Sequence, residues 1–296
     1  MKPLSLTQNV SRHLYRINQK KGANGLSLPS LVILLTLALS TSIVTVRLNA
    51  LSLEQEPVKA PPIQQAKILD EANYNPTWFT QGLYQEAGNT YISSGLYGRS
   101  AIIKQSKIPT PRQQRYRLNS RYFAEGLTLI DNTLYLLTWK ENTLLMFDKH
   151  SLKPIGKKEY KGEGWGLTHR PKTHTQDTEF IMSNGSDTLT FRDKETFKIK
   201  RELKVKHLDL INELEYVNGI IWANRWYDNH LYGIDSESGH ILAKVDLLPL
   251  RKKATTISNK NVVNGISYDK GKKALWVTGK YWNKRFLIEM PTIQEQ

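Results

Sequence analysis

The sequence contains no cysteine, which excludes disulfide bonds, thiolate metal ligands and cysteine nucleophiles. Histidine is also scarce, with seven residues in 296 and no HExxH pattern. Two of them, His169 and His174, lie in the polar stretch "THRPKTHTQD" and form no obvious cluster with the others. A catalytic zinc site is therefore not expected, because such a site needs several grouped protein ligands.

Acidic residues are missing from the first 50 positions, which hold six basic residues. The remaining chain has 36 basic and 27 acidic residues, so the formal charge of +15 falls to +9 outside this segment. The basic residues there are scattered and form neither a long block nor a nucleic-acid-binding motif. We therefore expect no nucleic-acid partner, although a basic surface would favour acidic partners or an anionic membrane face.

Charge of either sign is absent between Gly22 and Val46. This stretch approaches the roughly 20 residues that span a bilayer, and its positive flank is expected to stay in the cytoplasm. We expect a basic cytoplasmic leader at residues 1–21 and a transmembrane signal anchor at residues 22–47. A cleaved signal peptide is the alternative, although "RLNA", which ends at Ala50, is a poor cleavage site.

Both alternatives export the rest of the chain, and the lack of cysteine is compatible with an oxidising compartment. The expected localisation is a periplasmic domain anchored to a bacterial inner membrane. A polar, proline-containing linker is expected at residues 48–67, and a folded catalytic domain at residues 68–296.

Long helical periodicity is missing from this domain, where short apolar and aromatic runs are bounded by Gly, Asn and Asp. A pattern of three residues recurs, first as "QGL" and then as "EGL", "WGL", "NEL" and "NGI". Its first residues are spaced 44, 40, 47 and 52 positions apart, at Gln81, Glu125, Trp165, Asn212 and Asn264. This spacing is typical of four-stranded blades. The sequence therefore predicts an all-β, five-bladed β-propeller, preceded by the N-terminal membrane-targeting helix.

A second strand and a turn follow each repeat, and several copies add a third strand that ends in an Asp-containing turn, as in "LLMFDKHSL". In a propeller, the innermost strands line a central channel, and the residues at the ends of the first and second strands of each blade point toward one mouth. The repeat positions are therefore expected to converge there. The second-strand residues expected at the same rim are Trp139, Asn184, Trp226 and Lys280.

Some of these residue types also have purely structural roles in propellers. Tryptophan commonly packs between blades, and we expect this of Trp78, Trp222 and Trp276. Glu213 and Glu215 flank Leu214 on one strand and are expected to have a structural role or to bind a cation in the channel.

Ring closure needs one strand from outside the repeat order. We expect residues 66–74 to pair with "RFLIEM" (285–290) as the outer strand of the last blade.

Six motifs occur in a fixed order along the domain: "FTQGL" (79–83), "FAEGLT" (123–128), "GWGLT" (164–168), "NELEY" (212–216), "NGISYD" (264–269) and "VTGKYW" (277–282). In order and spacing they resemble the plant and bacterial type of glutaminyl-peptide cyclotransferase. That family is a five-bladed β-propeller that converts N-terminal glutamine to pyroglutamate and releases ammonia. The resemblance covers about residues 68–292. It departs from the family at Ala124 and Asn283, where Gly and Pro are common.

The resemblance implies roles for individual residues. Glu125 would be the proton-shuttling carboxylate, with Lys280 and Asn212 as further catalytic residues that donate to the γ-carbonyl oxygen. The residues that match the family's remaining substrate-binding pocket are Phe79, Gln81, Phe123, Trp139, Trp165 and Trp226. The implied reaction requires no metal or cofactor, and a structural cation in the central channel is left open.

The implied chemistry suits a carboxylate in a partly desolvated site, because it can take a proton from the α-amine and return it to the departing ammonia. The expected partners are peptides or proteins with N-terminal Gln, and the inner membrane through the anchor; the chain is expected to be a monomer. The alternative is a non-catalytic propeller that binds a peptide or carbohydrate in an aromatic pocket at the channel mouth. The fold alone supports both.

Overall fold

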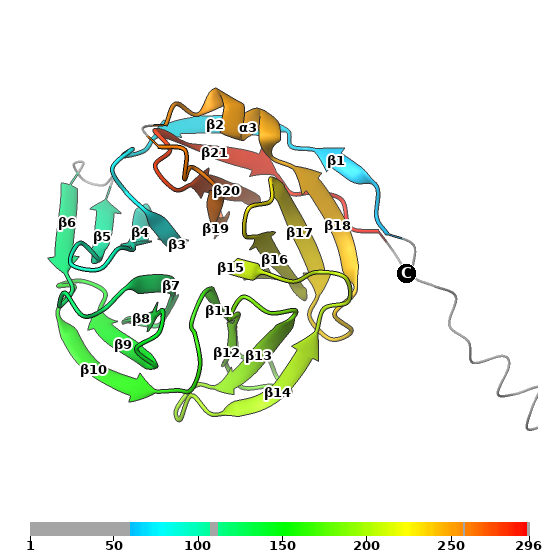
Figure 1. The fold of residues 1–296 in the computed structure, drawn as a ribbon. Helices are drawn as coiled ribbons and strands as arrows, with labels where there is room; N and C mark the ends of the chain where they lie inside the picture. The colour runs from blue at the N-terminus through cyan, green and yellow to red at the C-terminus, as the bar shows by residue number, and fades with distance from the viewer. Residues whose placement is uncertain (1–59, 107–111, 257, 295–296) are drawn as a thin grey trace, which may run out of the picture. The chain divides into compact units, whose positions relative to one another are not determined.

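Five β-sheets surround a common axis in the part of the chain that the computed structural model describes, residues 60–106, 112–256 and 258–294 (Figure 1). Each sheet forms one blade, so the predicted all-β, five-bladed propeller is confirmed. The expected leader, membrane anchor and first part of the linker lie outside the described residues. Within those residues, no helix is long and apolar enough to cross a membrane.

The first three blades follow one another along the chain, and neighbouring strands in each are antiparallel. Blade 1 consists of β3 (Thr80–Glu86), β4 (Asn89–Ser94), β5 (Ala101–Ser106) and β6 (Arg112–Arg117). Blade 2 consists of β7 (Ala124–Ile130), β8 (Thr133–Thr138), β9 (Thr143–Asp148) and β10 (Pro154–Glu159). Blade 3 consists of β11 (Leu167–Arg170), β12 (Glu179–Met182), β13 (Thr188–Asp193) and β14 (Ile199–Lys204).

The last two blades each receive a strand from the beginning of the described chain. Blade 4 consists of β15 (Ile211–Val217), β16 (Ile220–Arg225), β17 (His230–Asp235), β18 (Ile241–Asp246) and the added β1 (Ile63–Gln65). Blade 5 consists of β19 (Val263–Asp269), β20 (Ala274–Gly279), β21 (Lys284–Glu289) and β2 (Ile68–Asn73). The short helix α3 (Leu248–Lys253) lies in the connection between blades 4 and 5.

Ring closure follows the predicted pairing. Strand β2 lies antiparallel to β21 at the outer edge of blade 5, with Asn73 opposite Lys284, so the expected pairing of residues 66–74 with the C-terminal strand is confirmed. Strand β1 pairs in parallel with β18, although it lies within residues 48–67, which the sequence predicts to be a linker. Ordered pairing therefore begins before residue 68.

Local turn chemistry explains where many strands end. Between β15 and β16, Asn218 and Gly219 have φ values of 49° and 89°, as a tight type I′ hairpin turn requires. After the third strands, Asp148, Asp193 and Asp235 each accept hydrogen bonds from the backbone and the hydroxyl group of the Ser or Thr three residues later. These contacts close the Asp-containing turns that the sequence predicts.

The hydrophobic core lies between blades. The described residues form five clusters of buried side chains, and each cluster joins two neighbouring blades. Trp78, Trp222 and Trp276 are buried in these clusters, which confirms their predicted packing role. Burial of a large apolar side chain stabilises a fold by roughly 1.5–3 kcal/mol, so these contacts hold the blades at fixed relative positions.

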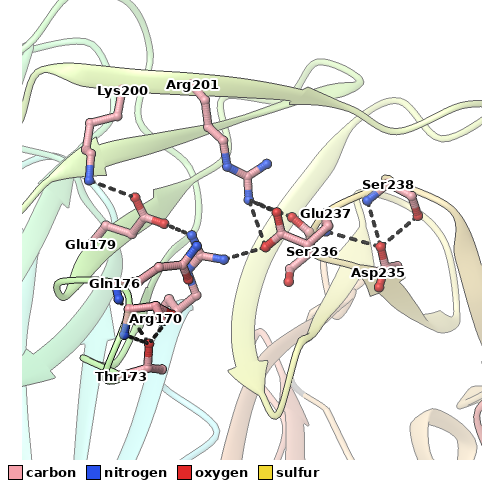
Figure 2. A network of polar contacts seen from close by, with 11 residues as sticks. Arg170, Thr173, Gln176, Glu179, Lys200, Arg201, Asp235, Ser236, Glu237 and Ser238 are labelled. Atoms are coloured by element: carbon pink, nitrogen blue, oxygen red, sulfur yellow. Dashed lines mark hydrogen bonds and ion pairs between the residues drawn. The ribbon is translucent and has the colours of Figure 1, made fainter.

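A polar network also ties blade 3 to blade 4 (Figure 2). Arg170, the last residue of β11, donates to Glu179 in β12 and, at 2.5 Å, to Glu237 in the turn after β17. Arg201 in β14 donates to the carbonyl oxygen of Ser236 at 2.7 Å. Because Arg170 and Glu179 are buried, separating them would leave an uncompensated charge. The network therefore restricts movement between these two blades.

Two buried carboxylates on β15 satisfy backbone groups of other inner strands. Glu213 accepts hydrogen bonds from the amides of Leu83 in blade 1 (3.2 Å) and Ile266 in blade 5 (2.9 Å). Glu215 accepts one from the Tyr268 amide in blade 5 (2.7 Å). These contacts match the expected structural role. In the ranges that the structure describes, no group of three or more His, Asp or Glu residues could hold a metal ion, and the channel cation stays a prediction.

Candidate functional site

A cavity of about 250 Å³ lies where the inner strands of the blades begin. Every predicted site residue lines it: Phe79, Gln81, Phe123, Glu125, Trp139, Trp165, Asn212, Trp226 and Lys280. Four further lining residues are Leu96, Tyr227, Lys260 and Val262. These four lie outside the repeat, so the sequence pattern could not place them.

Two residues that we expected at this mouth do not line the cavity. Asn264 is buried and contacts the site through its hydrogen bonds to Gln81. Asn184 is exposed and is not among the described residues that line the cavity. Its side-chain oxygen accepts hydrogen bonds from the amide and the hydroxyl group of Ser186. The local turn therefore holds this side chain out of the cavity, while the next residue, Gly185, packs against the ring of Trp165.

Strand starts and strand ends position the lining residues. Gln81, Glu125 and Asn212 are the second residues of the inner strands β3, β7 and β15. The register with the second strand shifts at each of these positions, which marks a β-bulge. A bulge re-aims side chains out of the regular pleat, and here it accompanies three polar groups that face the cavity. The residues that directly follow the second strands are Trp139, Trp226 and Lys280.

Glycine beside the repeat position lets neighbouring inner strands approach closely. A Cβ atom at Gly166 would lie 2.0 Å from the carbonyl oxygen of Asn212. At Gly126 it would lie 2.4 Å from the amide nitrogen of Leu167. No side chain fits at these two positions. Because glycine has none, successive blades approach closely enough to share one cavity.

Glu125 is held by a chain of hydrogen bonds. It is only 5% exposed, and its Oε1 accepts a hydrogen bond from Gln81 Nε2 at 3.0 Å. Asn264 Nδ2 donates to Gln81 Oε1 at 3.0 Å and so fixes the orientation of the Gln81 amide. Ser93 Oγ donates to the main-chain carbonyl oxygen of Glu125 at 2.5 Å. Among the described residues no donor bonds to Glu125 Oε2, which leaves this oxygen available to a ligand.

Burial controls the protonation of the two charged groups in the cavity. It raises the pKa of the Glu125 carboxyl well above its ordinary value; Lys280 opposes this shift, while Glu141 and Glu163 add to it. Burial also lowers the pKa of Lys280 to about 8, against the opposing effect of Glu125. Both groups therefore exchange protons more readily near neutral pH than an ordinary Glu or Lys does, which is typical of catalytic sites.

Aromatic rings wall the cavity. The Phe123 ring meets those of Phe79 and Trp139 edge to face, at centroid separations of 6.2 and 5.5 Å. The rings of Trp165 and Trp226 are perpendicular, with centroids 5.4 Å apart. These surfaces exclude water from Glu125 and can pack against the aliphatic part of a ligand.

Two donors complete the site. In the part of the chain that the structure describes, neither the side-chain amide of Asn212 nor the ammonium of Lys280 has a hydrogen-bond acceptor. Lys280 Nζ lies 4.5 Å from the centre of the Phe79 ring, a cation–π contact. The cavity thus offers a basic oxygen and the donors of Asn212 and Lys280 to a single ligand, and the exposed lining residue Lys260 adds a further ammonium. Its volume is below the roughly 300–1,000 Å³ of typical pockets for drug-sized molecules, which suits a ligand of about one residue.

Glu163, which the three-residue repeat does not include, lies in the connection between β10 and β11. Its Oε2 accepts hydrogen bonds from Trp139 Nε1 at 2.7 Å and from Trp165 Nε1 at 3.0 Å. Burial favours the neutral acid, but the hydrogen bonds from Trp165 and Trp139 and the charge of Lys140 lower the pKa of Glu163 below its ordinary value. The motif "EGWG" is the only sequence signal, and it does not reveal that an indole from another blade shares the same oxygen.

Similarity to known proteins covers most of the chain. Residues 37–290 match the model of the glutamine cyclotransferase family. A glutaminyl-peptide cyclotransferase from Arabidopsis thaliana is 30% identical over 236 residues, which cover 77% of this chain and 72% of the relative. The crystal structure of Myxococcus xanthus glutaminyl cyclase shares 28% sequence identity with a TM-score of 0.70, and the match covers 79% of this chain and 100% of that one.

Proposed function

Because the chain belongs to the glutamine cyclotransferase family, we propose that it converts the N-terminal glutamine of peptides and proteins to pyroglutamate, with Glu125 as the proton shuttle. One observation carries the assignment of Glu125. It is a buried carboxylate with a raised pKa, and it shares an aromatic cavity with two donors that have no acceptor among the described residues.

Each bond change can be assigned to a group in the cavity. The α-ammonium of the substrate lies against Glu125 Oε2 and gives it one proton. The resulting amine attacks the γ-carbonyl carbon of the same residue, which forms the ring C–N bond and places negative charge on the carbonyl oxygen. Glu125 then returns the proton to the amide nitrogen as the old C–N bond breaks. It next takes the second proton of the ring nitrogen, which becomes the pyroglutamate N–H, and passes this proton to the departing ammonia. The products are pyroglutamate and ammonium, so atoms and charge balance without a further reactant.

The other polar groups bind and orient the substrate. Asn212 and Lys280 donate to the γ-carbonyl oxygen, where removal of one such donor typically costs about 2.7–4 kcal/mol of transition-state stabilisation. Gln81 holds Glu125 in place through the hydrogen bond to Oε1. The aromatic walls favour the compact, cyclising conformation of the glutamine side chain over extended ones. The proposed steps use side chains alone and require no metal or cofactor.

The test is the variant Glu125→Gln, which keeps the shape of the side chain and removes its basicity. Its rate of ammonia release from a Gln-initiated peptide is expected to fall by about 10²–10⁴, the usual contribution of general acid–base catalysis. Circular dichroism and thermal unfolding should show an intact fold. The matched control is Glu159→Gln, an exposed carboxylate at the end of β10, which should keep the wild-type rate.

Two results would count against the proposal. Wild-type turnover by Glu125→Gln would remove Glu125 from the chemistry. A folded wild-type protein that releases no ammonia, and leaves the peptide mass unchanged, would instead favour a non-catalytic propeller that binds peptides or carbohydrates in the aromatic pocket.

We also propose that residues 22–47 anchor this domain, as a monomer, to the periplasmic face of a bacterial inner membrane. The support is the uncharged stretch that follows a basic leader. Protease added to intact spheroplasts should then degrade the domain; full protection would contradict this topology.

A further inference from the structure

We propose that Glu163 is a positioning residue of this site, which holds the indoles of Trp139 and Trp165 in the orientation that the glutamine side chain of the substrate needs. The proposal rests on the proposed cyclase function. The two indoles come from different blades, because Trp139 follows β8 in blade 2 and Trp165 precedes β11 in blade 3. A single atom, Glu163 Oε2, accepts a hydrogen bond from each ring nitrogen.

The contacts around this carboxylate fix Trp139 in several directions. Glu163 Oε1 lies 3.7 Å from the ammonium of Lys140, and this ammonium lies 4.1 Å from the centre of the Trp139 ring. The indole N–H therefore bonds to Glu163 while a ring face meets Lys140. Two further ring contacts are with Phe123 and Tyr97, at centroid separations of 5.5 and 6.5 Å. Movement of Glu163 would release the ring that borders Glu125 in the cavity wall.

These contacts order the cavity without supporting the core. The side chain of Glu163 is 41% exposed and that of Lys140 is 54% exposed, and ion pairs at such exposure contribute little to stability. Trp139 and Trp165 are partly exposed in the cavity wall, whereas Trp222 and Trp276 are buried between blades. Loss of the Glu163 contacts should therefore disturb the substrate's position while the propeller stays folded.

Two substitutions of Glu163 distinguish the effect of its side-chain length from the effect of its charge. Glu163→Gln removes the charge but keeps an oxygen at the same distance from the backbone, and one oxygen is sufficient because Oε2 alone serves both indoles. Glu163→Asp keeps the charge but is one methylene shorter, so it cannot reach both rings. We expect Glu163→Gln to keep most of the wild-type kcat/KM. Glu163→Asp should lose about a hundredfold, the order of loss that a displacement of about 1 Å can cause.

The indole N–H resonances provide a readout that does not depend on activity. The chain has seven tryptophans. In ¹⁵N–¹H spectra, the signals of Trp139 and Trp165 should shift in Glu163→Asp and stay near their wild-type positions in Glu163→Gln. Trp226, whose ring lies 5.4 Å from that of Trp165, can follow Trp165, whereas the buried Trp78, Trp222, Trp276 and Trp282 should stay unchanged in both variants. Glu159→Ala removes an exposed carboxylate at the end of β10. It is the control for a change in net charge and should match the wild type.

The outcomes distinguish this proposal from the proposed function. A wild-type enzyme that does not cyclise Gln-initiated peptides overturns both. An active wild type with an equally active Glu163→Asp, or a Glu163→Gln that loses as much activity as Glu163→Asp, overturns only the positioning role. Retention in Glu163→Gln, together with loss of activity and two shifted indole signals in Glu163→Asp, supports it.

Discussion

Glu125 and Lys280 must hold opposite charges for the proposed reaction, and burial shifts the pKa of each toward neutrality. Glu125 takes a proton only when it is ionised, so activity falls as the pH drops below its raised pKa. Lys280 donates to the oxyanion best as an ammonium, so activity falls as the pH rises above its lowered pKa of about 8. Two buried side chains at one cavity thus set the acid and alkaline limits of the proposed reaction.

The alkaline limit tests the role of Lys280. The wild-type kcat/KM is expected to decline above about pH 8. In Lys280→Arg the decline should move to higher pH, because a guanidinium stays protonated throughout this range. The α-amine of the substrate loses its proton near the same pH, but this titration is common to both proteins, so only the difference between their alkaline limits is assigned to Lys280.

The measurement for Lys280 is a pH–rate profile of ammonia release for each protein. Arginine differs from lysine in shape, so the absolute rate will also change, and only the position of the alkaline limit is compared. An identical limit in both proteins would show that Lys280 does not set it.

At the scale of strands, the three-residue repeat predicted the residues that line the cavity. Equivalent positions in successive blades face the same axis, so residues about 40–50 positions apart in the sequence lie close together in the fold. Gln81, Glu125 and Asn212 hold the same place in three inner strands. Contacts outside the repeat could not be predicted. Glu163 lies in a connection with no period, and the three-residue strand β1 is too short to show one. Their positions depend on contacts with elements distant in the sequence, and a local sequence pattern does not predict such contacts.

Each inner strand of the described blades has one edge that faces the axis and pairs with no other strand. The backbone amides on this edge therefore need hydrogen-bond acceptors outside their own sheet. Glu215 supplies one to the Tyr268 amide across the boundary between blades 4 and 5. Burial raises the pKa of Glu215 from 4.5 to about 8, against the opposing hydrogen bonds from Tyr268 and Thr168. The folded state therefore keeps a proton that the unfolded state loses between these two values. The contribution of Glu215 to stability falls as the pH rises through that window.

The variant Glu215→Gln tests this sign, because it keeps an oxygen for the Tyr268 amide and does not titrate. Its free energy of unfolding, relative to that of the wild type, is expected to increase as the pH rises from 4.5 to about 8. Urea unfolding at both ends of this window provides the comparison. His169, whose pKa burial lowers to about 4, affects both proteins alike and cancels. A difference that stays constant with pH would contradict the expected titration.

The whole molecule matters to the site because every blade contributes to one cavity: Gln81 from blade 1, Glu125 from blade 2, Trp165 from blade 3, Asn212 from blade 4 and Lys280 from blade 5. Separation at any boundary between blades would move one of these groups away from the others. Blade 5 lies next to blade 1 and closes the ring. Its outer strand, β2, comes from the beginning of the described chain and pairs with β21 near the C-terminus. Closure there holds Lys280 near Glu125.

A disulfide between β2 and β21 should therefore stabilise the ring, and the native chain has no cysteine to compete with it. Asn73 and Lys284 are directly opposite each other, and such pairs have Cα separations of about 4.5–5.5 Å, within the range that a disulfide bridges. The matched local control joins Thr188 and Lys204, which are opposite each other in β13 and β14. The closing pair spans roughly 210 residues and the local pair roughly 16, so chain entropy favours the former by about 2 kcal/mol.

The measurement compares each double variant with its own reduced form, which removes the effect of losing the Lys284–Glu71 ion pair. Oxidation of Asn73→Cys/Lys284→Cys should raise the free energy of unfolding in urea by more than oxidation of Thr188→Cys/Lys204→Cys does. Ammonia release should continue in the oxidised protein, because the bond fixes a pairing that the active fold already contains. Equal gains for the two disulfides would contradict a closing role for β2. Loss of activity on oxidation would show that the working enzyme needs the ring to open at this boundary.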